Sequence, residues 1–195
     1  MVDIKSELKS NQTILFVMSS GEYNENIVSV IKKLSGNICY ITTNKTFYSL
    51  KEIFLKKKIE IGNIVFIDTI SKAMMKIPDQ SEDVYYVSSP GALTELSLVI
   101  KKFLKHDFDY LVFDAVTNLL TYQDNNMCNK FLADLVDKVK RSKTRAIFYA
   151  VESSNNEDLI AKVGTVVDKV IRGKFSKSFV LSNEKIEKIK INKEG

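Results

Sequence analysis

The amino-acid sequence predicts a three-layer α/β/α domain with a mostly parallel sheet and an antiparallel β-meander at its C-terminal end. Short runs of β-branched and aromatic residues alternate with longer segments whose apolar residues recur at helical spacing, and this alternation favours a parallel sheet with helices on both faces. The apolar runs are continuous, which is typical of strands covered on both sides. The rhythm changes after residue 166, where short strand-like runs follow one another directly.

Six continuous apolar runs are predicted to form the parallel strands. They span residues 14–18, 38–42, 64–67, 84–87, 110–113 and 146–151. Ser89 and Pro90 are expected to open the helix before the fifth strand, since serine caps helices and proline fits their first turn. Residues 71–83 are expected to form an irregular loop. The meander is predicted to contain three strands, at residues 166–171, 179–181 and 186–191.

The composition indicates a single globular domain over residues 1–195. Apolar residues make up 45% of the chain, which is enough to bury a core. No apolar run approaches the ~20 residues that a membrane span requires. The polar, mixed-charge first residues do not resemble a signal peptide, so a cytoplasmic location without membrane contact is expected.

The cysteines and the single histidine do not predict a metal site. Cys39 lies inside an apolar run and Cys128 lies near a predicted helix start, with no histidine close to either in sequence. His106 falls in the turn before the fifth strand, at the opposite end of the sheet from the strand ends that bind ligands. Two buried thiols and no metal are therefore expected.

The turn after the first predicted strand stands where a phosphate-binding P-loop would lie, because ligands bind beyond the carboxyl ends of parallel strands. The residues that bear on this site are Ser19, Ser20, Gly21, Glu25 and Asn26. A working P-loop is rich in glycine and ends in lysine followed by serine or threonine. Here Glu25 and Asn26 take those last two positions, and a carboxylate there would repel a triphosphate by about 1–4 kcal/mol at ~4 Å. The preferred interpretation is a degenerate loop that forms a plain strand–helix turn with Asn24 as its cap.

The other strand ends supply the remaining candidates. Asp114 follows four apolar residues of the fifth strand and precedes Thr117, a pattern typical of the Mg²⁺ ligand of P-loop ATPases. Asp68 ends the third strand in the same way. For both aspartates the alternative is a carboxylate bonded to local backbone N–H groups. With Thr43 and Glu152 these residues could converge in a crevice at the strand ends.

Four segments are similar to the RecA-type domain of KaiC-related archaeal proteins. They are residues 109–120 (DYLVFDAVTNLL), 129–152, 167–172 and 86–96, the last of which looks like a feature of uncharacterised archaeal offshoots of that family, and the resemblance extends over a core of about residues 12–192. It implies a RecA-like fold, ATP with Mg²⁺ at the first strand–helix turn, and ring-shaped oligomers. The chain departs from the family pattern at Glu25 and Asn26, and the second strand is not followed by a carboxylate until Glu52.

These observations favour a non-catalytic pseudo-ATPase without a cofactor, serving as a binding, regulatory or scaffold module for a protein partner or for further copies of itself. Tyr23, Tyr48 and Tyr122 are candidates for exposed contacts. One alternative is a ligand sensor or ATPase that binds ATP and Mg²⁺ in the strand-end crevice. Another is a nucleic-acid-binding paralogue: the net charge of +5 permits this, but the loop at residues 121–126 has no basic residue, and the lysines of residues 185–193 suit a solvated edge strand.

Overall fold

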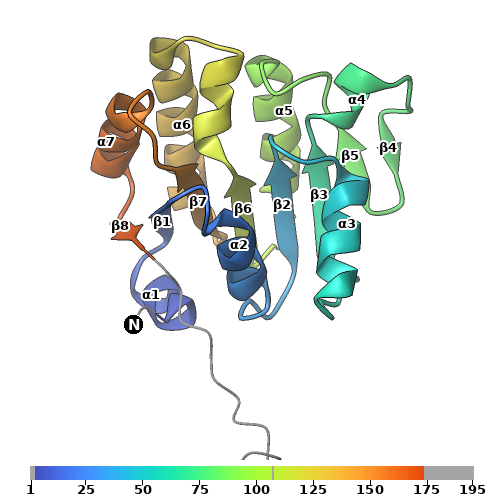
Figure 1. Cartoon of the computed structure of the whole chain (residues 1–195), viewed down its shortest axis with the longest axis horizontal. Coiled ribbons are helices and arrows are strands. Elements are labelled where there is room, and N and C mark those ends of the chain that lie inside the picture. The colour runs from blue at the N-terminus through green and yellow to red at the C-terminus, as the bar shows by residue number, and fades with distance from the viewer. Residues whose placement is uncertain (1–2, 107, 174–195) are drawn as a thin grey trace, which may run out of the picture.

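The computed structural model describes residues 3–106 and 108–173, which form a three-layer α/β/α fold (Figure 1). Within these residues an eight-stranded sheet runs in the order β4-β5-β3-β2-β6-β7-β1-β8. All neighbouring strands are parallel except β4 and β5. The strands are β1 (Thr13–Met18), β2 (Ile38–Thr42), β3 (Ile64–Asp68), β4 (Gln80–Ser81), β5 (Val84–Tyr86), β6 (Tyr110–Asp114), β7 (Arg145–Val151) and β8 (Lys169–Arg172). The helices are α1 (Ile4–Ser10), α2 (Tyr23–Ile31), α3 (Phe47–Lys56), α4 (Ser71–Met74), α5 (Leu93–Phe103), the 3₁₀ helix η1 (Val116–Thr121), α6 (Asn125–Lys140) and α7 (Glu157–Val166).

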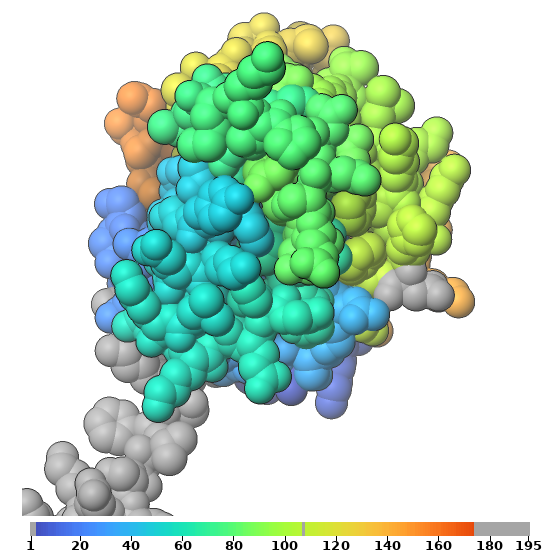
Figure 2. Space-filling view, turned by 90° about the vertical axis from the view of Figure 1, so that its right-hand side faces the viewer, coloured from blue at the N-terminus to red at the C-terminus, as the bar shows by residue number. Residues whose placement is uncertain are grey.

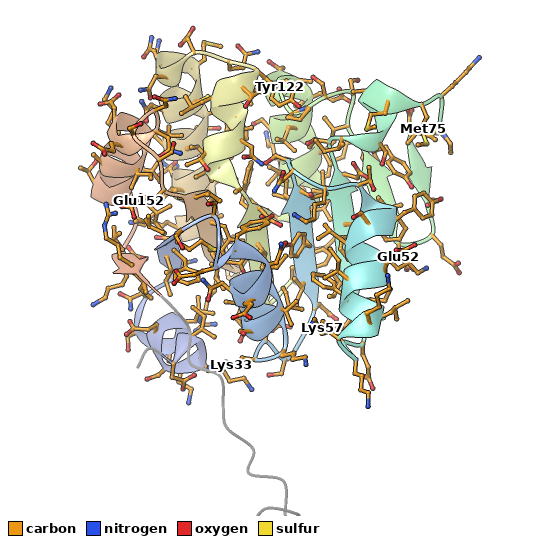
Figure 3. The ribbon with its side chains drawn as sticks, in the orientation of Figure 1. Lys33, Glu52, Lys57, Met75, Tyr122 and Glu152 are labelled. Atoms are coloured by element: carbon orange, nitrogen blue, oxygen red, sulfur yellow. The ribbon has the colours of Figure 1, made fainter. Side chains whose placement is uncertain are left out.

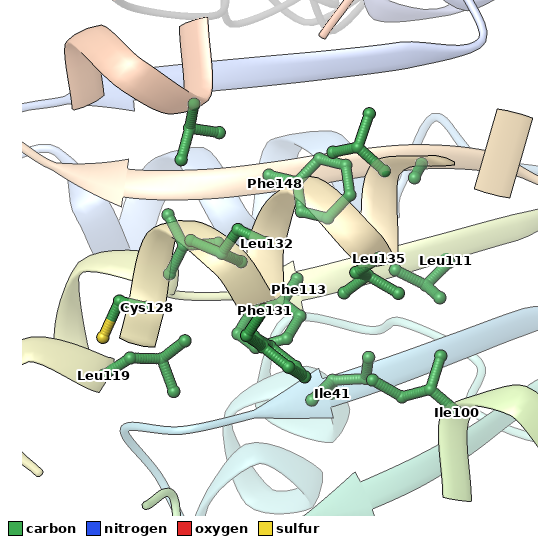
Figure 4. Close-up of a cluster of buried hydrophobic side chains, with 14 of the residues drawn as sticks. Ile41, Ile100, Leu111, Phe113, Leu119, Cys128, Phe131, Leu132, Leu135 and Phe148 are labelled. Carbon is green, nitrogen blue, oxygen red and sulfur yellow. The ribbon is translucent and has the colours of Figure 1, made fainter. Parts of the chain in front are cut away.

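The sheet separates two hydrophobic cores, because successive side chains of a strand point to opposite faces. Helices α2 and α3 cover one face and α5, α6 and α7 cover the other (Figure 1). Phe16 and Tyr40 lie in the core under α2 and α3, whereas their neighbours Leu15 and Ile41 lie in the opposite core. Figure 4 shows this second core, in which Phe113 and residues of α6 pack together. Both cores pack against the strands whose ends carry the predicted site residues.

Most of the sequence-predicted strands are present within a residue or two of their expected ends, and three expectations were wrong. Residues 71–83 are not simply a loop: they contain α4 and β4, and β4 pairs with β5 at one edge of the sheet. In the space-filling view, α3 and the α4–β4 segment close this side of the molecule (Figure 2). Helix α5 begins at Leu93, because residues 89–92 form a turn in which the Ala92 N–H donates to the Ser89 carbonyl (3.1 Å).

The third correction concerns the start of the predicted meander. Helix α7 continues to Val166, so the next strand, β8, begins only at Lys169. It pairs with β1 in the parallel sense, because α7 returns the chain to the same end of the sheet before β8 starts. The other two predicted meander strands lie outside the described residues. No described helix combines the length and the apolar character that crossing a membrane would require.

Candidate functional site

The side chain of Asp114, at the carboxyl end of β6, is enclosed by tyrosines. Asp114 is fully buried, and its Oδ2 accepts a hydrogen bond of 2.5 Å from the hydroxyl of Tyr40 on the neighbouring strand β2. Its Oδ1 accepts a hydrogen bond from the hydroxyl of Tyr23, the first residue of α2. Both carboxylate oxygens are therefore engaged by phenol donors from within the fold.

A third tyrosine completes this group. Tyr149 of β7 is fully buried, and its hydroxyl has no hydrogen-bond partner among the described residues. Burial raises the pKa of Tyr149 well above its usual value, and the nearby charge of Asp114 raises it further. We call Asp114, Tyr23, Tyr40 and Tyr149 the tyrosine cluster. All three phenols remain protonated at neutral pH, because burial raises their pKa values, and those of Tyr23 and Tyr40 act as donors toward the carboxylate.

Burial is the main influence on Asp114, and it raises the pKa of this carboxyl above its ordinary value. The hydroxyls of Tyr23 and Tyr40 and the positive charge of Lys45 act in the opposite direction without cancelling it. The Lys45 ammonium lies 4.5 Å from the centre of the Tyr23 ring, a cation–π arrangement. Lys45 thus covers the outer side of the ring that seals the carboxylate from solvent.

The turn that the sequence placed at the P-loop position is short and outward-facing. Ser19, Ser20 and Gly21 are exposed, and the Glu22 N–H donates to the Ser19 carbonyl at 3.1 Å. Helix α2 begins at Tyr23 without a side-chain cap, so Asn24 is not the cap that the sequence suggested.

The two positions that would carry the lysine and the hydroxyl of a P-loop point in different directions. Glu25 is exposed on the first turn of α2. Asn26 is buried, and its side-chain amide lies 3.8 Å from the sulfur of Met18, at the end of β1. Glu25 and Asn26 therefore supply neither the cation nor the hydroxyl with which a P-loop binds phosphate and Mg²⁺.

Thr43 is the predicted site residue that lies nearest to Asp114, and it joins two strand ends. Its backbone N–H donates to the Asp114 carbonyl at 2.7 Å, and its hydroxyl accepts from the Ala115 N–H at 3.0 Å. The same hydroxyl lies 2.8 Å from the Ala115 carbonyl, to which it donates. Thr43 therefore fixes the end of β2 to the end of β6 through the backbone.

Asp68 also has a local role. Its Oδ2 accepts from the Phe47 N–H (2.7 Å) and the Ser71 hydroxyl (2.6 Å), and its Oδ1 accepts from the N–H groups of Ile70 (2.7 Å) and Ser71 (2.9 Å). This buried carboxylate satisfies backbone donors at the starts of α3 and α4, as the alternative interpretation of the sequence proposed.

The last two predicted residues contact β7 and β8. The Thr117 hydroxyl accepts from the Val151 N–H at 3.1 Å, and Glu152 forms an exposed ion pair with Arg172 of β8. Figure 3 shows Glu152 well to the side of α2 and β6. The structure thus brings Thr43 and Asp114 together, while Asp68, Thr117 and Glu152 serve separate parts of the fold.

The tyrosines of the cluster were not among the predicted site residues. Tyr23 was expected to be an exposed contact residue, yet it is only 5% exposed, whereas Tyr48 (58%) and Tyr122 (48%) are indeed exposed. The signal in the sequence is the presence of Tyr40 and Tyr149 within otherwise apolar strands, because a buried tyrosine hydroxyl generally requires a partner. Cys39 and Cys128 are buried free thiols, as predicted, and the described residues contain no group of three potential metal ligands.

The fold that carries this site is similar to the fold of KaiC-like proteins. A KaiC-like protein of the hyperthermophilic archaeon Pyrococcus horikoshii OT3 matches it with a TM-score of 0.58 and 11% identity, over 87% of this chain and 74% of that chain. An uncharacterized protein of Pyrococcus horikoshii, solved in complex with an unknown peptide, matches with a TM-score of 0.62 and 12% identity, over 88% and 83%. The chain itself belongs to DUF7090, a family of unknown function, whose match spans residues 7–179. No curated protein matches the chain.

Proposed function

We propose that this protein is a non-catalytic RecA-like module that binds a protein partner, and that its ancestral nucleotide site is closed. The observation that carries the proposal is the engagement of both Asp114 oxygens by tyrosine hydroxyls in a fully buried site. Mg²⁺ binds through oxygen ligands and retains several waters of hydration. The buried carboxylate faces phenols instead of an open, hydrated position, so the residues present do not fit a Mg²⁺–nucleotide complex.

The turn before α2 supports the same proposal. P-loops bind phosphates through converging backbone N–H groups and a lysine. The side chain at the lysine position is the carboxylate of Glu25, and the first residue of the helix, Tyr23, is directed into the fold toward Asp114. A triphosphate would meet a negative charge and would have to displace a buried tyrosine.

The surface at the carboxyl ends of the strands supports protein binding. Several large apolar side chains are exposed on segments that follow strand ends on this side: Tyr48, Met74, Met75, Tyr122 and Met127. Figure 3 shows Met75 and Tyr122 along this end of the molecule. Exposed methionine and tyrosine are favoured at protein interfaces, where a flexible or amphipathic side chain adapts to a partner. The peptide held by the second Pyrococcus protein is compatible with such a role for this fold.

Isothermal titration with ATP and Mg²⁺ tests the closed nucleotide site. We expect no binding tighter than ~100 μM, which corresponds to about 5.5 kcal/mol. Glu152→Gln is a control variant that leaves the cluster intact. Binding below ~100 μM that is lost in Asp114→Asn and retained in Glu152→Gln would overturn the proposal and favour the alternative of an ATP-binding sensor.

Affinity capture tests the protein-binding surface. Met75→Glu is expected to lose bound partners, because a charge in an apolar contact must be desolvated without compensation. Leu98→Glu is the matched control, since Leu98 is also exposed (59%) but lies on α5, away from the strand ends. Equal recovery of partners by the two variants would contradict the proposed surface. Light scattering at several protein concentrations would identify self-association as the alternative mode.

A further inference from the structure

A groove lies at the opposite end of the sheet, where α2 and α3 finish. It has a volume of about 560 Å³ and is formed by the C-terminal ends of the two helices and the residues that follow them. Leu34 and Ile59 are buried and form apolar parts of its lining, whereas the exposed Lys32 and Lys58 line it from α2 and from the turn after α3. The groove thus presents lysines from the residues that follow two separate helices.

Two more lysines stand beside the groove. Lys33 follows Lys32 and Lys57 precedes Lys58, and Figure 3 shows Lys33 and Lys57 at this end of the molecule. Among the described residues none of these four lysines has a carboxylate within ion-pair distance, whereas the neighbouring Lys56 pairs with Glu52. The only carboxylate that lines the groove is Glu60. With four lysines and one glutamate, the local net charge is therefore positive. We call the groove together with these four lysines the lysine groove.

The backbone of Lys58 shows that one of these charges is held at a cost. Its φ angle is +56°, in the left-handed region that favours glycine. The Lys58 N–H donates to the Leu55 carbonyl (2.9 Å) and the Ile59 N–H donates to the Phe54 carbonyl (2.9 Å), which together form a Schellman motif at the end of α3. Glycine is the usual residue at this position of the motif. A lysine at this position places an ammonium group at the groove, although glycine, which has no side chain, would make this turn more stable.

We propose that the lysine groove binds the phosphate backbone of a nucleic acid without reading its sequence. Lysine ammonium groups are suited to phosphate contacts, which supply most of the sequence-independent affinity for nucleic acids. On residues 31–37 and 55–63, Leu55 is the only large apolar side chain that is exposed in the described structure, so this surface lacks the apolar residues that anchor an amphipathic segment in a membrane. The site is independent of the tyrosine cluster and of the protein-binding surface at the other end.

Fluorescence anisotropy with a labelled DNA duplex of about 20 base pairs tests the proposal on the full chain. Four phosphate contacts predict a slope of about −3.6 for log K against log salt concentration, or a loss of about 150-fold between ~50 and ~200 mM salt. A variant in which the four lysines of the groove are replaced by glutamine is expected to lose most of this affinity and slope. The matched control replaces four other exposed lysines that lack described ion pairs, with the same change in net charge: Lys101, Lys102, Lys105 and Lys130.

Two single substitutions separate binding from folding. Lys58→Gly is expected to raise the midpoint of thermal unfolding, because glycine favours the left-handed backbone, while it lowers the salt slope by about 0.9. Glu60→Gln is expected to strengthen duplex binding about twofold, since it removes one repulsive charge from the groove. A folding defect cannot produce the first combination, because a destabilised variant would change both properties for the worse.

Three outcomes would overturn the proposal. In the first, the quadruple groove variant and its matched control lose equal affinity, so that the groove has no special role. In the second, the wild-type chain does not bind the duplex at ~50 mM salt. In the third, the chain binds vesicles that contain phosphatidylserine through the groove lysines and does not bind the duplex, which would assign the surface to a membrane.

Discussion

Removal of a single hydroxyl, by Tyr23→Phe, tests whether the tyrosine cluster stabilises a buried charge. The phenylalanine ring keeps the packing of Tyr23 and its contact with Lys45, whereas the hydroxyl that donates to Asp114 is lost. A hydrogen bond to a charged group contributes about 1.5–3 kcal/mol, and an unsatisfied buried acceptor adds to the cost. Because Asp114 is fully buried, solvent does not replace the donor, and we expect the free energy of unfolding to fall by about 2 kcal/mol.

Urea unfolding at neutral pH, with Tyr122→Phe as the control, measures this loss. The control removes a hydroxyl from a side chain that is 48% exposed and is expected to cost less than about 0.5 kcal/mol. In a double-mutant cycle with Asp114→Asn, the two changes are expected to couple by about 1–2 kcal/mol. Additive effects, or a loss below about 0.5 kcal/mol for Tyr23→Phe, would show that the hydroxyl does not support the carboxylate and would refute the reasoning.

Four further measurements follow from three carboxyls and the two buried thiols. Because the folded pKa of Asp114 is raised, the stability of the wild type relative to Asp114→Asn is expected to be greatest below about pH 4 and to decline as the pH rises through the folded value; an increase with pH would contradict this. Asp68→Asn places an amide donor against backbone donors and is expected to cost about 3 kcal/mol in urea unfolding. Asp168→Asn is expected to cost most above about pH 4. Desolvation raises the pKa of Asp168, but its hydrogen bonds and Lys140 outweigh this effect and lower that pKa below its usual value. Cys39 and Cys128 are expected to react with a thiol reagent only after unfolding, since burial raises both pKa values, that of Cys128 to about 11; rapid reaction in the native state would be inconsistent with their burial.

The sequence carried enough information to predict the parallel sheet, because its strands are continuous apolar runs whose ends can be read directly. The run of residues 38–42, for example, is β2 without any change of boundary. The short elements were harder to predict. Helix α1 has seven residues and β4 has two, and such segments form because the rest of the fold offers them a surface to pack against or a strand to pair with.

The candidate site was predictable only in part, for a different physical reason. Asp114 and Thr43 could be identified as strand-end residues, and parallel pairing brings such ends to one edge of the sheet. The tyrosine cluster depends on which strands are neighbours. Tyr40 reaches Asp114 because β2 lies beside β6, although about 70 residues separate them in sequence. The tyrosines can be seen in the sequence, but the strand order that places their hydroxyls beside the Asp114 carboxylate cannot be read from it.

The strand order also determines when the protein can complete its fold. Within the described sheet, β1 pairs with β7 on one side, where Thr13 is opposite Ala146, and with β8 on the other. Strand β1 is synthesised well before β7 and β8, so its apolar residues remain unpaired until those two strands have been made. Contacts between such distant segments slow folding, since a long loop must close before they form. During synthesis β1 is the segment most in need of protection from association with other chains.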